Sequence, residues 1–392
     1  MGILNLPIFL AALAIIFDGL DNQLLGFAIP AIVKDWHVTR AAFAPIVASG
    51  LVGMGLGSTL AGPIGDRLGR RTALIGSVFF FGVATALTAF AGSLPVLGIL
   101  RFIAGAGIGG AMPNATAIAA EFSAVTRRAV AVSATIICVP IGGMIGGAAA
   151  ARILPTMGWH TLFAAGGVAP LFLCVVLWFL LPESPGFGKQ ALQTPLTDVF
   201  AGGRLRDTLS LCLTFFCCLM TVYMAFSWLP ALLAAEGLSL AVASSGLAFY
   251  NVGGIAGALL CGWGISRFGS RIPMLAVAAV GALSALLLLA IPISATGDHT
   301  GLLAGFALHG FFVNAVNVSV FALAAHVYPA AVRSSGIAFA LTVGRLGPLL
   351  SAFTGAALIQ AGRPAFLEFL ALAMAGCFVG LALVRDHIKR PD

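Results

Sequence analysis

Charged side chains are scarce in this chain: Asp, Glu, Lys and Arg make up only 8% of its 392 residues. Soluble domains carry about 25%, so this scarcity excludes an ordinary water-soluble domain. Apolar residues account for 60% of the chain and glycine for 49 residues, which is typical of helices packed closely in a lipid bilayer. The net charge of +7 does not indicate nucleic-acid binding, because the basic residues lie in short loops between apolar runs.

Clusters of metal-binding residues are also lacking. All seven cysteines lie inside apolar runs, and no Cys/His group has the spacing of metal ligands, so we expect no disulfide and no metal site. No set of nucleophile, base and orienting group stands out, which disfavours a membrane-embedded enzyme. The sequence therefore predicts a membrane protein that is not an enzyme and needs no cofactor.

Apolar stretches long enough to cross a bilayer recur along the whole chain. The first has no basic segment before it and is too long for a signal peptide, so we expect it to remain as a spanning helix. The predicted helices are 7–32, 42–64, 72–92, 95–120, 129–151, 161–181, 209–234, 243–265, 273–293, 301–326, 335–358 and 364–384.

These segments predict an all-α membrane protein with twelve transmembrane helices in two pseudo-symmetric six-helix bundles. The bundles are expected at 1–181 and 209–392, joined by a cytoplasmic linker at 182–208 that is rich in proline and glycine. Two segments repeat between the halves. Gly62-x4-Arg67-x-Gly69-x-Arg71 recurs 200 residues later, and Ala119-Ala120-Glu121 with Arg128 recurs 205 residues later with histidine in place of glutamate. Repeats in one orientation are typical of a two-bundle transporter.

The lysines and arginines predict the orientation. With both termini in the cytoplasm, fourteen of them lie on the inner side and four on the outer side, and the positive-inside rule favours this arrangement. The inner residues are Arg67, Arg70, Arg71, Arg127, Arg128, Lys189, Arg204, Arg206, Arg267, Arg271, Arg333, Arg385, Lys389 and Arg390, and the outer ones are Lys34, Arg40, Arg152 and Arg363.

Two acids interrupt the first apolar run. Asp18 and Asp21 are three residues apart and Asn22 follows, so all three face one side of a helix. A charge at bilayer depth costs roughly 2.5 kcal/mol or more. We expect this face to meet a cavity or partner helices, as a proton or substrate site or, alternatively, as a structural polar patch.

Two arginines lie inside predicted helices. At about 1.5 Å per residue, Arg101 falls near the level of Asp21, and Arg345 falls near the bilayer midplane, as does Asp18. An Asp21–Arg101 pair would compensate both charges. Arg345 lies beside Gly344 and before Gly347-Pro348, where we expect a kink. It is the predicted partner of a substrate carboxylate; the alternative is a structural pair with Asp18.

Other polar residues inside the spans carry weaker signals. His309 is a candidate for proton relay, although a lone histidine of this kind is as often a packing residue. Asn314 and Asn317 share a helix face, and either could line a cavity. Tyr223 and Trp228 could stack on an aromatic ring, while Trp228 could equally be an interfacial anchor.

Several short motifs together carry a family resemblance. GPIGDRLGRR at Gly62–Arg71 resembles the cytoplasmic signature of the major facilitator superfamily, and LPESPGF at Leu181–Phe187 resembles a signature of its sugar-porter-like and organic-ion members. DGLD at Asp18–Asp21, RFIAGAGIGG from Arg101, YPAAVRSSG at Tyr328–Gly336 and GRLGP at Gly344–Pro348 narrow the resemblance to the aromatic acid:proton symporter family.

This resemblance implies roles for matched residues. The acids of the DGxD motif, the loop aspartate and the arginines near the helix 335–358 matter for transport in that family, which here are Asp18, Asp21, Asp66, Arg333 and Arg345. The second copy of the loop has Ser266 at the position of Asp66, so we expect the first copy to act as a gate. The predicted cytoplasmic gate comprises Gly62, Asp66, Arg67, Gly69, Arg70, Arg71, Glu121, Arg128 and Arg333, although these charges could also serve topology alone.

The predicted function is proton-coupled import of a small aromatic carboxylate, such as a hydroxybenzoate, across the inner (plasma) membrane by a monomer. Proton coupling is expected at Asp18, Asp21, Arg101 and His309. Substrate binding is expected at Arg345, Asn22, Tyr223, Trp228, Asn314 and Asn317. The alternatives are a symporter of a non-aromatic organic acid or a sugar-like solute and, from another class, a membrane receptor that does not transport.

Overall fold

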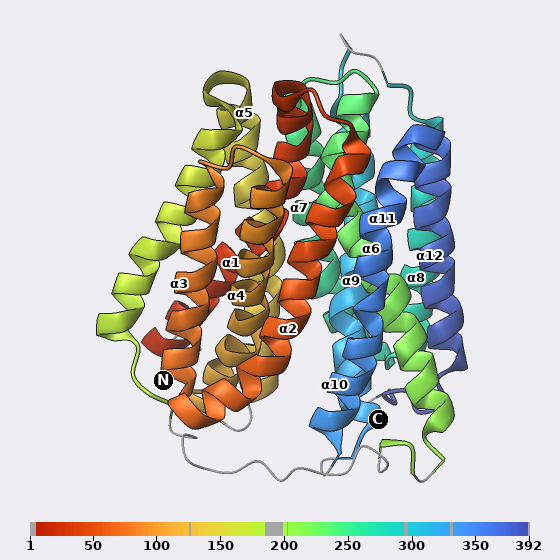
Figure 1. Ribbon diagram of the computed structural model, residues 1–392. Coiled ribbons are helices and arrows are strands. Elements are labelled where there is room, and N and C mark those ends of the chain that lie inside the picture. Colours follow the sequence, from red (N-terminus) through yellow and green to blue (C-terminus); the bar gives the residue numbers. More distant parts are fainter. Residues whose placement is uncertain are drawn as a thin grey trace. The chain divides into compact units, whose positions relative to one another are not determined.

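The computed structural model describes residues 5–124, 127–184, 199–201, 203–293, 297–329 and 332–390, and the regular structure within them is helical. The helices, shown in Figure 1, are α1 (Leu6–Trp36), η1 (Arg40–Phe43), α2 (Ala44–Leu68), α3 (Arg70–Thr88), α4 (Leu94–Glu121), α5 (Arg128–Leu180), α6 (Leu205–Ala235), α7 (Leu240–Phe268), α8 (Arg271–Leu287), η4 (Leu288–Ala290), α9 (Thr300–Val327), α10 (Arg333–Gly344), α11 (Leu346–Ala361) and α12 (Arg363–Leu383).

The chain forms two compact units. Unit 1 comprises Met1–Ala191 and Ser239–Ala248, and unit 2 comprises Leu192–Leu238 and Phe249–Asp392. Unit 1 therefore holds α1 to α5 and the first residues of α7, while unit 2 holds α6, the rest of α7, and α8 to α12. Most of the predicted linker, at 185–198, lies outside the described residues.

Eleven segments of the described chain are long and apolar enough to cross a membrane, so the protein is a multi-pass membrane protein. One of them, α5, covers 53 residues and contains Gly158 in a non-helical conformation (φ 76°, ψ 177°), where two helices meet at a kink. The helix predicted to end at residue 151 thus continues further. The residues that follow it include Arg152, Pro155 and Thr156, yet the helical conformation persists as far as the glycine that tolerates a positive φ.

Glycines let the helices of unit 1 approach at backbone distance. An added Cβ at Gly57 of α2 would collide with the carbonyl of Ala106 in α4, and one at Gly105 of α4 would collide with the carbonyl of Gly50. Small residues four apart on facing helices allow such packing in a bilayer, where close van der Waals contact replaces the hydrophobic effect. The abundance of glycine in the sequence is therefore used at helix crossings.

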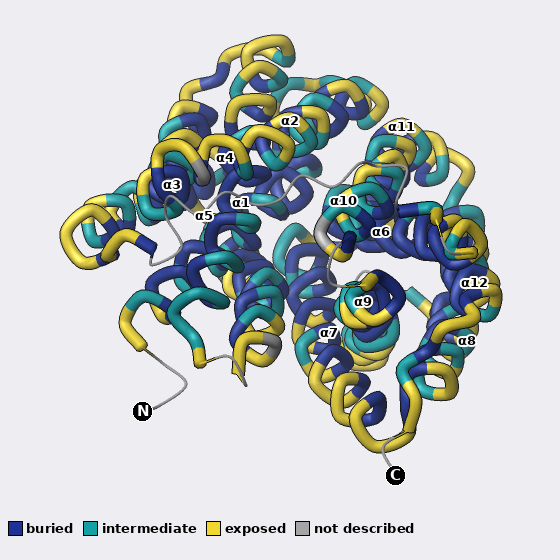
Figure 2. Tube along the Cα trace, turned by 90° about the horizontal axis from the view of Figure 1, so that it is seen from below, coloured by how far each residue is buried: buried dark blue, intermediate teal, exposed yellow. Residues whose placement is uncertain are grey.

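Each unit is built around one enclosed helix. In unit 1, α1 contacts both α4 and α5, and several of its apolar residues, including Ile15 and Phe27, are completely buried. In unit 2, α6 contacts α9, α10, α11 and α12, and 78% of its most apolar 18-residue window is buried. Large apolar side chains such as Phe172 and Leu372 are exposed, as expected for positions that face lipid, and Figure 2 colours the exposed positions along the trace yellow.

The chain after α12 docks onto the ends of neighbouring helices of unit 2. The backbone N–H of Arg385 donates to Asp207 Oδ1 (2.7 Å), and Ser270 exchanges two 2.9 Å hydrogen bonds with the backbone of Ile388. Ser270 Oγ also lies 3.0 Å from His387 Nδ1, and His387 Nε2 lies 3.1 Å from the carbonyl of Leu381. These contacts fit a neutral imidazole, in which Nε2–H donates and Nδ1 accepts.

We predict that acid loosens this C-terminal segment. Burial lowers the pKa of His387 below its ordinary value and outweighs the hydrogen bond to the Leu381 carbonyl, which raises it; Arg271 lowers the pKa further, against smaller opposing effects of Asp207 and Asp386. The undocked segment therefore takes up a proton more readily, and the docking free energy that depends on neutral His387 is lost as pH falls below about 6.5. Hydrogen exchange of residues 385–390, expressed as protection factors, should fall between about pH 7 and pH 5.

A background variant removes a neighbouring histidine whose ion pair could mask the effect. His326 Nε2 lies 3.4 Å from Asp386 Oδ1, and this pair strengthens when His326 gains a proton, so the experiment is made in His326→Gln. In that background His387→Asn should abolish most of the pH dependence. Protection that stays constant with pH before His387 is replaced would contradict the prediction.

Candidate functional site

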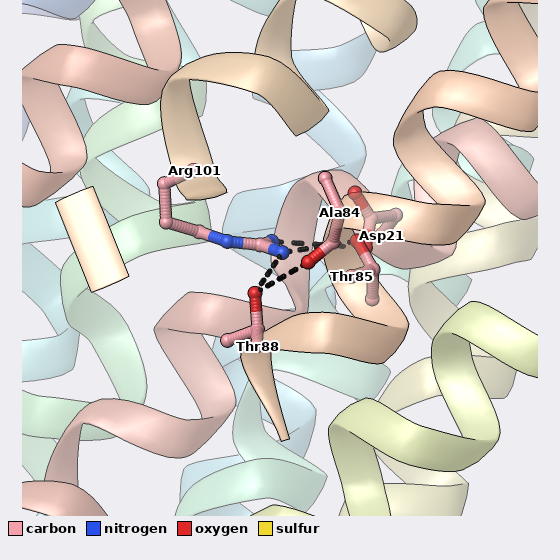
Figure 3. A network of polar contacts seen from close by, with 5 residues as sticks. All are labelled: Asp21, Ala84, Thr85, Thr88 and Arg101. Carbon is pink, nitrogen blue, oxygen red and sulfur yellow. Dashed lines mark hydrogen bonds and ion pairs between the residues drawn. The ribbon is translucent and has the colours of Figure 1, made fainter. Parts of the chain in front are cut away.

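A buried ionic network occupies the centre of unit 1 (Figure 3). Arg101 Nη1 of α4 lies 3.7 Å from Asp21 Oδ1 of α1, and the side chains are 5% and 0% exposed, respectively. Thr85 Oγ1 of α3 donates to the same carboxylate oxygen at 2.5 Å. The ion pair predicted from the depths of Asp21 and Arg101 is therefore confirmed, and it joins three helices.

Two threonines of α3 complete the coordination of the arginine. Arg101 Nη2 donates to Thr85 Oγ1 (3.0 Å) and to Thr88 Oγ1 (2.9 Å), and its guanidinium carbon lies 5.1 Å from the centroid of the Phe163 ring. These partners were not predicted. The available signal was the three-residue spacing of Thr85 and Thr88 on one helix face, but threonine is common in apolar helices because it can bond its own backbone.

Two buried atoms of the network can still form hydrogen bonds. Asp21 Oδ2 and Arg101 Nε are buried and have no hydrogen-bond partner among the described residues. Asp18 is 3% exposed and interacts electrostatically with Asp21, one helical turn away. Within the described part of unit 1, no arginine or lysine nitrogen lies within ion-pair distance of Asp18. One guanidinium, paired with Asp21, therefore stands against two carboxyl groups among these residues, and with both acids ionised the site has an excess of one negative charge.

The backbone fixes the position of these acids. An added Cβ at Gly19, between Asp18 and Asp21, would collide with the backbone of Val139 in α5, and one at Gly142 would collide with the carbonyl of Ile16 in α1. Reciprocal contact of this kind leaves α1 no room to slide along α5 without separating from it. Asn22, the third residue of the predicted polar face, is half-buried.

The predicted carboxylate-binding arginine lies at a helix break in unit 2. Arg345 separates α10 from α11 and is half-buried, so the predicted kink is confirmed. An added Cβ at Gly344 would press on Phe215 of α6, and one at Gly347 would collide with the carbonyl of Phe216. The broken helix is thus held against α6, and Tyr223 of α6 lies near Arg345.

The other predicted binding residues of unit 2 differ in their surroundings. Asn314 is buried and donates to the carbonyl of Gly310 in its own helix (3.1 Å), and half-buried Asn317 receives a long contact from Cys218 Sγ (4.0 Å). Trp228 is completely buried and packs where Gly355 of α11 leaves space. Its alternative role as an interfacial anchor is wrong, because an anchor must face the lipid boundary.

The loop after α2 is joined to the end of α5. The backbone N–H of Arg71 donates to Glu183 Oε1 (3.1 Å), and the guanidinium of Arg71 binds the carbonyl of Trp178 and lies 5.5 Å from the centroid of its ring. Gly69 has φ 94° and comes so close to the Glu183 carboxylate that a Cβ would overlap it. Glu183 was not predicted as a gate residue, although it lies in the LPESPGF motif.

The remaining predicted gate residues are not brought into one cluster. Arg67 and Arg128 are exposed, and Glu121, Gly62 and Arg70 are half-buried. Arg333 lies in unit 2, where Nε donates to the carbonyl of Tyr328 (3.2 Å). The side chain of Asp66 lies outside what the structure describes.

Comparison with known proteins identifies the family. The chain matches the Major Facilitator Superfamily over residues 11–297 and 211–392. It belongs to this superfamily. It is therefore a membrane transporter rather than an enzyme, as predicted.

Individual relatives agree with the predicted resemblance to aromatic acid transporters. The chain is 31% identical to a gallate transporter of Pseudomonas putida, over 97% of this chain and 91% of the relative. It is 32% identical to the 4-hydroxybenzoate transporter PcaK of Pseudomonas aeruginosa, over 91% and 86%. Its fold matches the inward-open xylose transporter XylE of Escherichia coli with a TM-score of 0.78, 18% identity and coverage of 97% and 96%.

We predict that replacing Arg101 alone destabilises the protein far more than replacing Arg101 and Asp21 together. Arg101→Leu leaves a buried carboxylate without its guanidinium, and breaking such a pair costs about 3–5 kcal/mol. Asp21→Asn in the same chain removes the stranded charge and should recover more than half of this loss. Reversible unfolding in mixed detergent micelles measures the cycle, with exposed Arg128→Leu as the control. Additive losses would show that the two side chains stabilise unit 1 independently.

Proposed function

We propose that the protein is a proton symporter that imports a small aromatic carboxylate resembling hydroxybenzoate. The observation that carries the proposal is the charge imbalance in the described part of unit 1, where Asp18 and Asp21 are both buried and the one buried arginine beside them pairs with Asp21. A proton on one carboxyl group makes the site neutral, whereas losing that proton leaves an uncompensated charge out of water, which is costly. Binding and release of one proton thus change the stability of the buried site.

Within this site we assign the titrating role to Asp18. Asp21 already accepts a hydrogen bond from Thr85 and has Arg101 beside it, and both contacts favour its charged form. Asp18 has no comparable cation among the described residues of unit 1 and is the group that protonation relieves. Protons are the only coupling ion in the proposal, and no cofactor takes part.

The substrate class rests on Arg345 and on the relatives. A planar guanidinium at a helix break can bind a carboxylate with two parallel hydrogen bonds, and the neighbouring Tyr223 adds an aromatic face. The relatives are named as transporters of gallate and 4-hydroxybenzoate, which are aromatic carboxylates. The ring of Tyr223 packs on the ring of Phe226, with their centroids 5.8 Å apart. Unit 2 therefore offers aromatic surface beside the charge of Arg345.

The membrane arrangement completes the proposal. Counting the two parts of α5 on either side of Gly158 separately, and α10 with α11 as one broken helix, gives twelve spans in two six-helix halves. The basic residues favour an inner-membrane protein with both termini in the cytoplasm. We propose that the monomer works by alternating access, with the Gly62–Arg71 loop and its contact to Glu183 as the cytoplasmic gate.

Uptake into proteoliposomes tests the function. With an inward proton gradient, purified protein should accumulate labelled 4-hydroxybenzoate above its external concentration, and unlabelled aromatic acids should compete better than aliphatic acids or sugars. Asp18→Asn mimics the protonated acid permanently, so uphill accumulation should be lost while exchange of internal for external substrate persists. Accumulation by Asp18→Asn equal to the parent would place the coupling elsewhere, and substrate binding without any flux would indicate a receptor.

A second prediction concerns the carboxylate. If Arg345 binds it, Arg345→Ala should weaken binding of benzoate more than tenfold, because an ion pair shielded from water contributes more than the ~1 kcal/mol of a surface pair. Benzamide lacks the charge, should bind the parent poorly, and should change little in the variant. Arg345→Lys keeps the charge without the planar fork and should also bind benzoate less tightly than the parent.

Calorimetry or fluorescence titration in detergent compares acid and amide on the parent and both variants. Equal weakening of benzoate and benzamide in Arg345→Ala would show that the arginine holds α10 and α11 in place and does not bind substrate.

A further inference from the structure

Three helices of unit 2 bring together a tyrosine, a histidine and a serine that the proposed carboxylate site does not use. His309 of α9 is 1% exposed, and its ring centroid lies 6.1 Å from that of Tyr250 in α7, which is completely buried. Ser284 Oγ of α8 lies 2.9 Å from His309 Nδ1. The backbone fixes this arrangement, because an added Cβ at Gly310 would collide with the carbonyl of Tyr250.

The serine determines which nitrogen of His309 carries the proton. Ser284 has a single hydroxyl proton, which it donates to the carbonyl of Gly281 at 2.7 Å. With the hydroxyl proton directed to that carbonyl, the contact with His309 is a hydrogen bond from Nδ1–H to the serine oxygen. A neutral imidazole with its proton on Nδ1 has a lone pair on Nε2, so Nε2 is an acceptor.

Two polar atoms of this cluster have no hydrogen-bond partner among the described residues: His309 Nε2 and the hydroxyl of Tyr250. A buried polar group left unpaired costs about 1–3 kcal/mol, and folded proteins pair the large majority of such groups. One atom is an acceptor and the other can donate. The group that complements both must itself donate one hydrogen bond and accept another.

A hydroxyl group has this property. A carboxylate offers acceptors only and an ammonium group donors only, so neither satisfies both atoms. The surroundings are aromatic, since the Phe226 ring lies 6.4 Å from Tyr250 and 5.8 Å from Tyr223. Tyr223 in turn lies near Arg345. A succession of rings thus runs from the proposed carboxylate-binding arginine to the neutral donor and acceptor.

We propose that Tyr250 and His309 bind a ring hydroxyl of the substrate, with Tyr250 donating to the hydroxyl oxygen and the hydroxyl donating to His309 Nε2. This inference rests on the proposed function and extends it, because it assigns the discrimination between hydroxylated and unsubstituted aromatic acids to particular side chains. It also gives His309 a neutral binding role in place of the proton relay expected from the sequence. Ser284 is a positioning residue that holds the required tautomer.

Paired ligands test the assignment on the full-length protein in detergent. Affinities for 4-hydroxybenzoate, 3-hydroxybenzoate and benzoate are measured on the parent, Tyr250→Phe and His309→Phe. The parent should bind at least one hydroxybenzoate about tenfold more tightly than benzoate, as two additional hydrogen bonds of ordinary strength allow. Each variant should lose about five- to tenfold for that hydroxybenzoate and stay within twofold of the parent for benzoate.

Tyr328→Phe is the matched control. Tyr328 is also completely buried in unit 2, but its hydroxyl donates to Thr208 Oγ1 at 3.2 Å, outside the proposed site, so this variant should leave the ratio of the affinities unchanged. Thermal unfolding of each variant shows that it is folded, and Tyr250→Phe keeps the ring that packs on Phe226.

The outcomes separate this inference from the function on which it rests. The hydroxyl site would be overturned by equal losses for all three acids, by no loss in either variant, or by a parent that does not prefer a hydroxybenzoate. If the three acids behave alike, a buried water pairs with His309 Nε2 and the Tyr250 hydroxyl instead. If the parent binds none of the three acids, the proposed function itself fails.

Discussion

The pairing of Arg101 with Asp21 is the interaction on which the interior of unit 1 depends. In a bilayer each charge must be compensated by the protein, because water is absent and lipid offers no partner. The network meets this demand for one carboxylate through the guanidinium and the hydroxyl of Thr85. For Asp18 this demand is not met among the described residues of unit 1, which offer it no cation. Burying an uncompensated acid is costly, and a purely structural site would have no reason to carry that cost.

The glycine contacts have a mechanical consequence for this chemistry. Gly19 meets the backbone of Val139 beside the acids, and Gly57 and Gly105 do the same between α2 and α4. Backbones in direct contact have no side-chain layer that could rearrange, so small sliding movements inside unit 1 are blocked. Under the proposed function, a charge change at Asp18 would therefore be relieved by movement of the unit as a body, as in the alternating access of two-bundle transporters.

The sequence could predict most of the fold because the signals were strong and local. Long apolar runs predict membrane helices from length alone, and the motifs predict the superfamily from their order. Depth along two helices was enough to pair Asp21 with Arg101, and the glycines and proline beside Arg345 predicted the helix break. The helix predicted to end at residue 151 continues to the kink at Gly158, which lies inside the predicted break at 152–160. Arg152, Pro155 and Thr156 mark that break in the sequence but do not locate the turn within it.

Side-chain partners from other helices could not be predicted in the same way. Thr85 and Thr88 bind Arg101 only because α3 and α4 cross at that height and rotation, and a helix's rotation about its own axis leaves little trace in a sequence that is apolar on all sides. Tyr250 gave no signal for the same reason: its significance comes from the unpaired hydroxyl and from His309 beside it. Orphaned polar atoms are visible only once the packing is known.

The charges assign different tasks to the two units under the proposed function. Unit 1 has an excess acid and unit 2 presents Arg345, so the proton and the substrate anion each meet the opposite charge in a different unit. Importing a carboxylate alone against an inside-negative potential costs about 2.3 kcal/mol per 100 mV. One accompanying proton cancels that charge, and a single titrating acid supplies it. Under the proposed function, the one acid in excess over the arginine of unit 1 carries that single proton. Uptake of a monovalent anion with one proton is insensitive to the membrane potential, while the pH gradient still drives it.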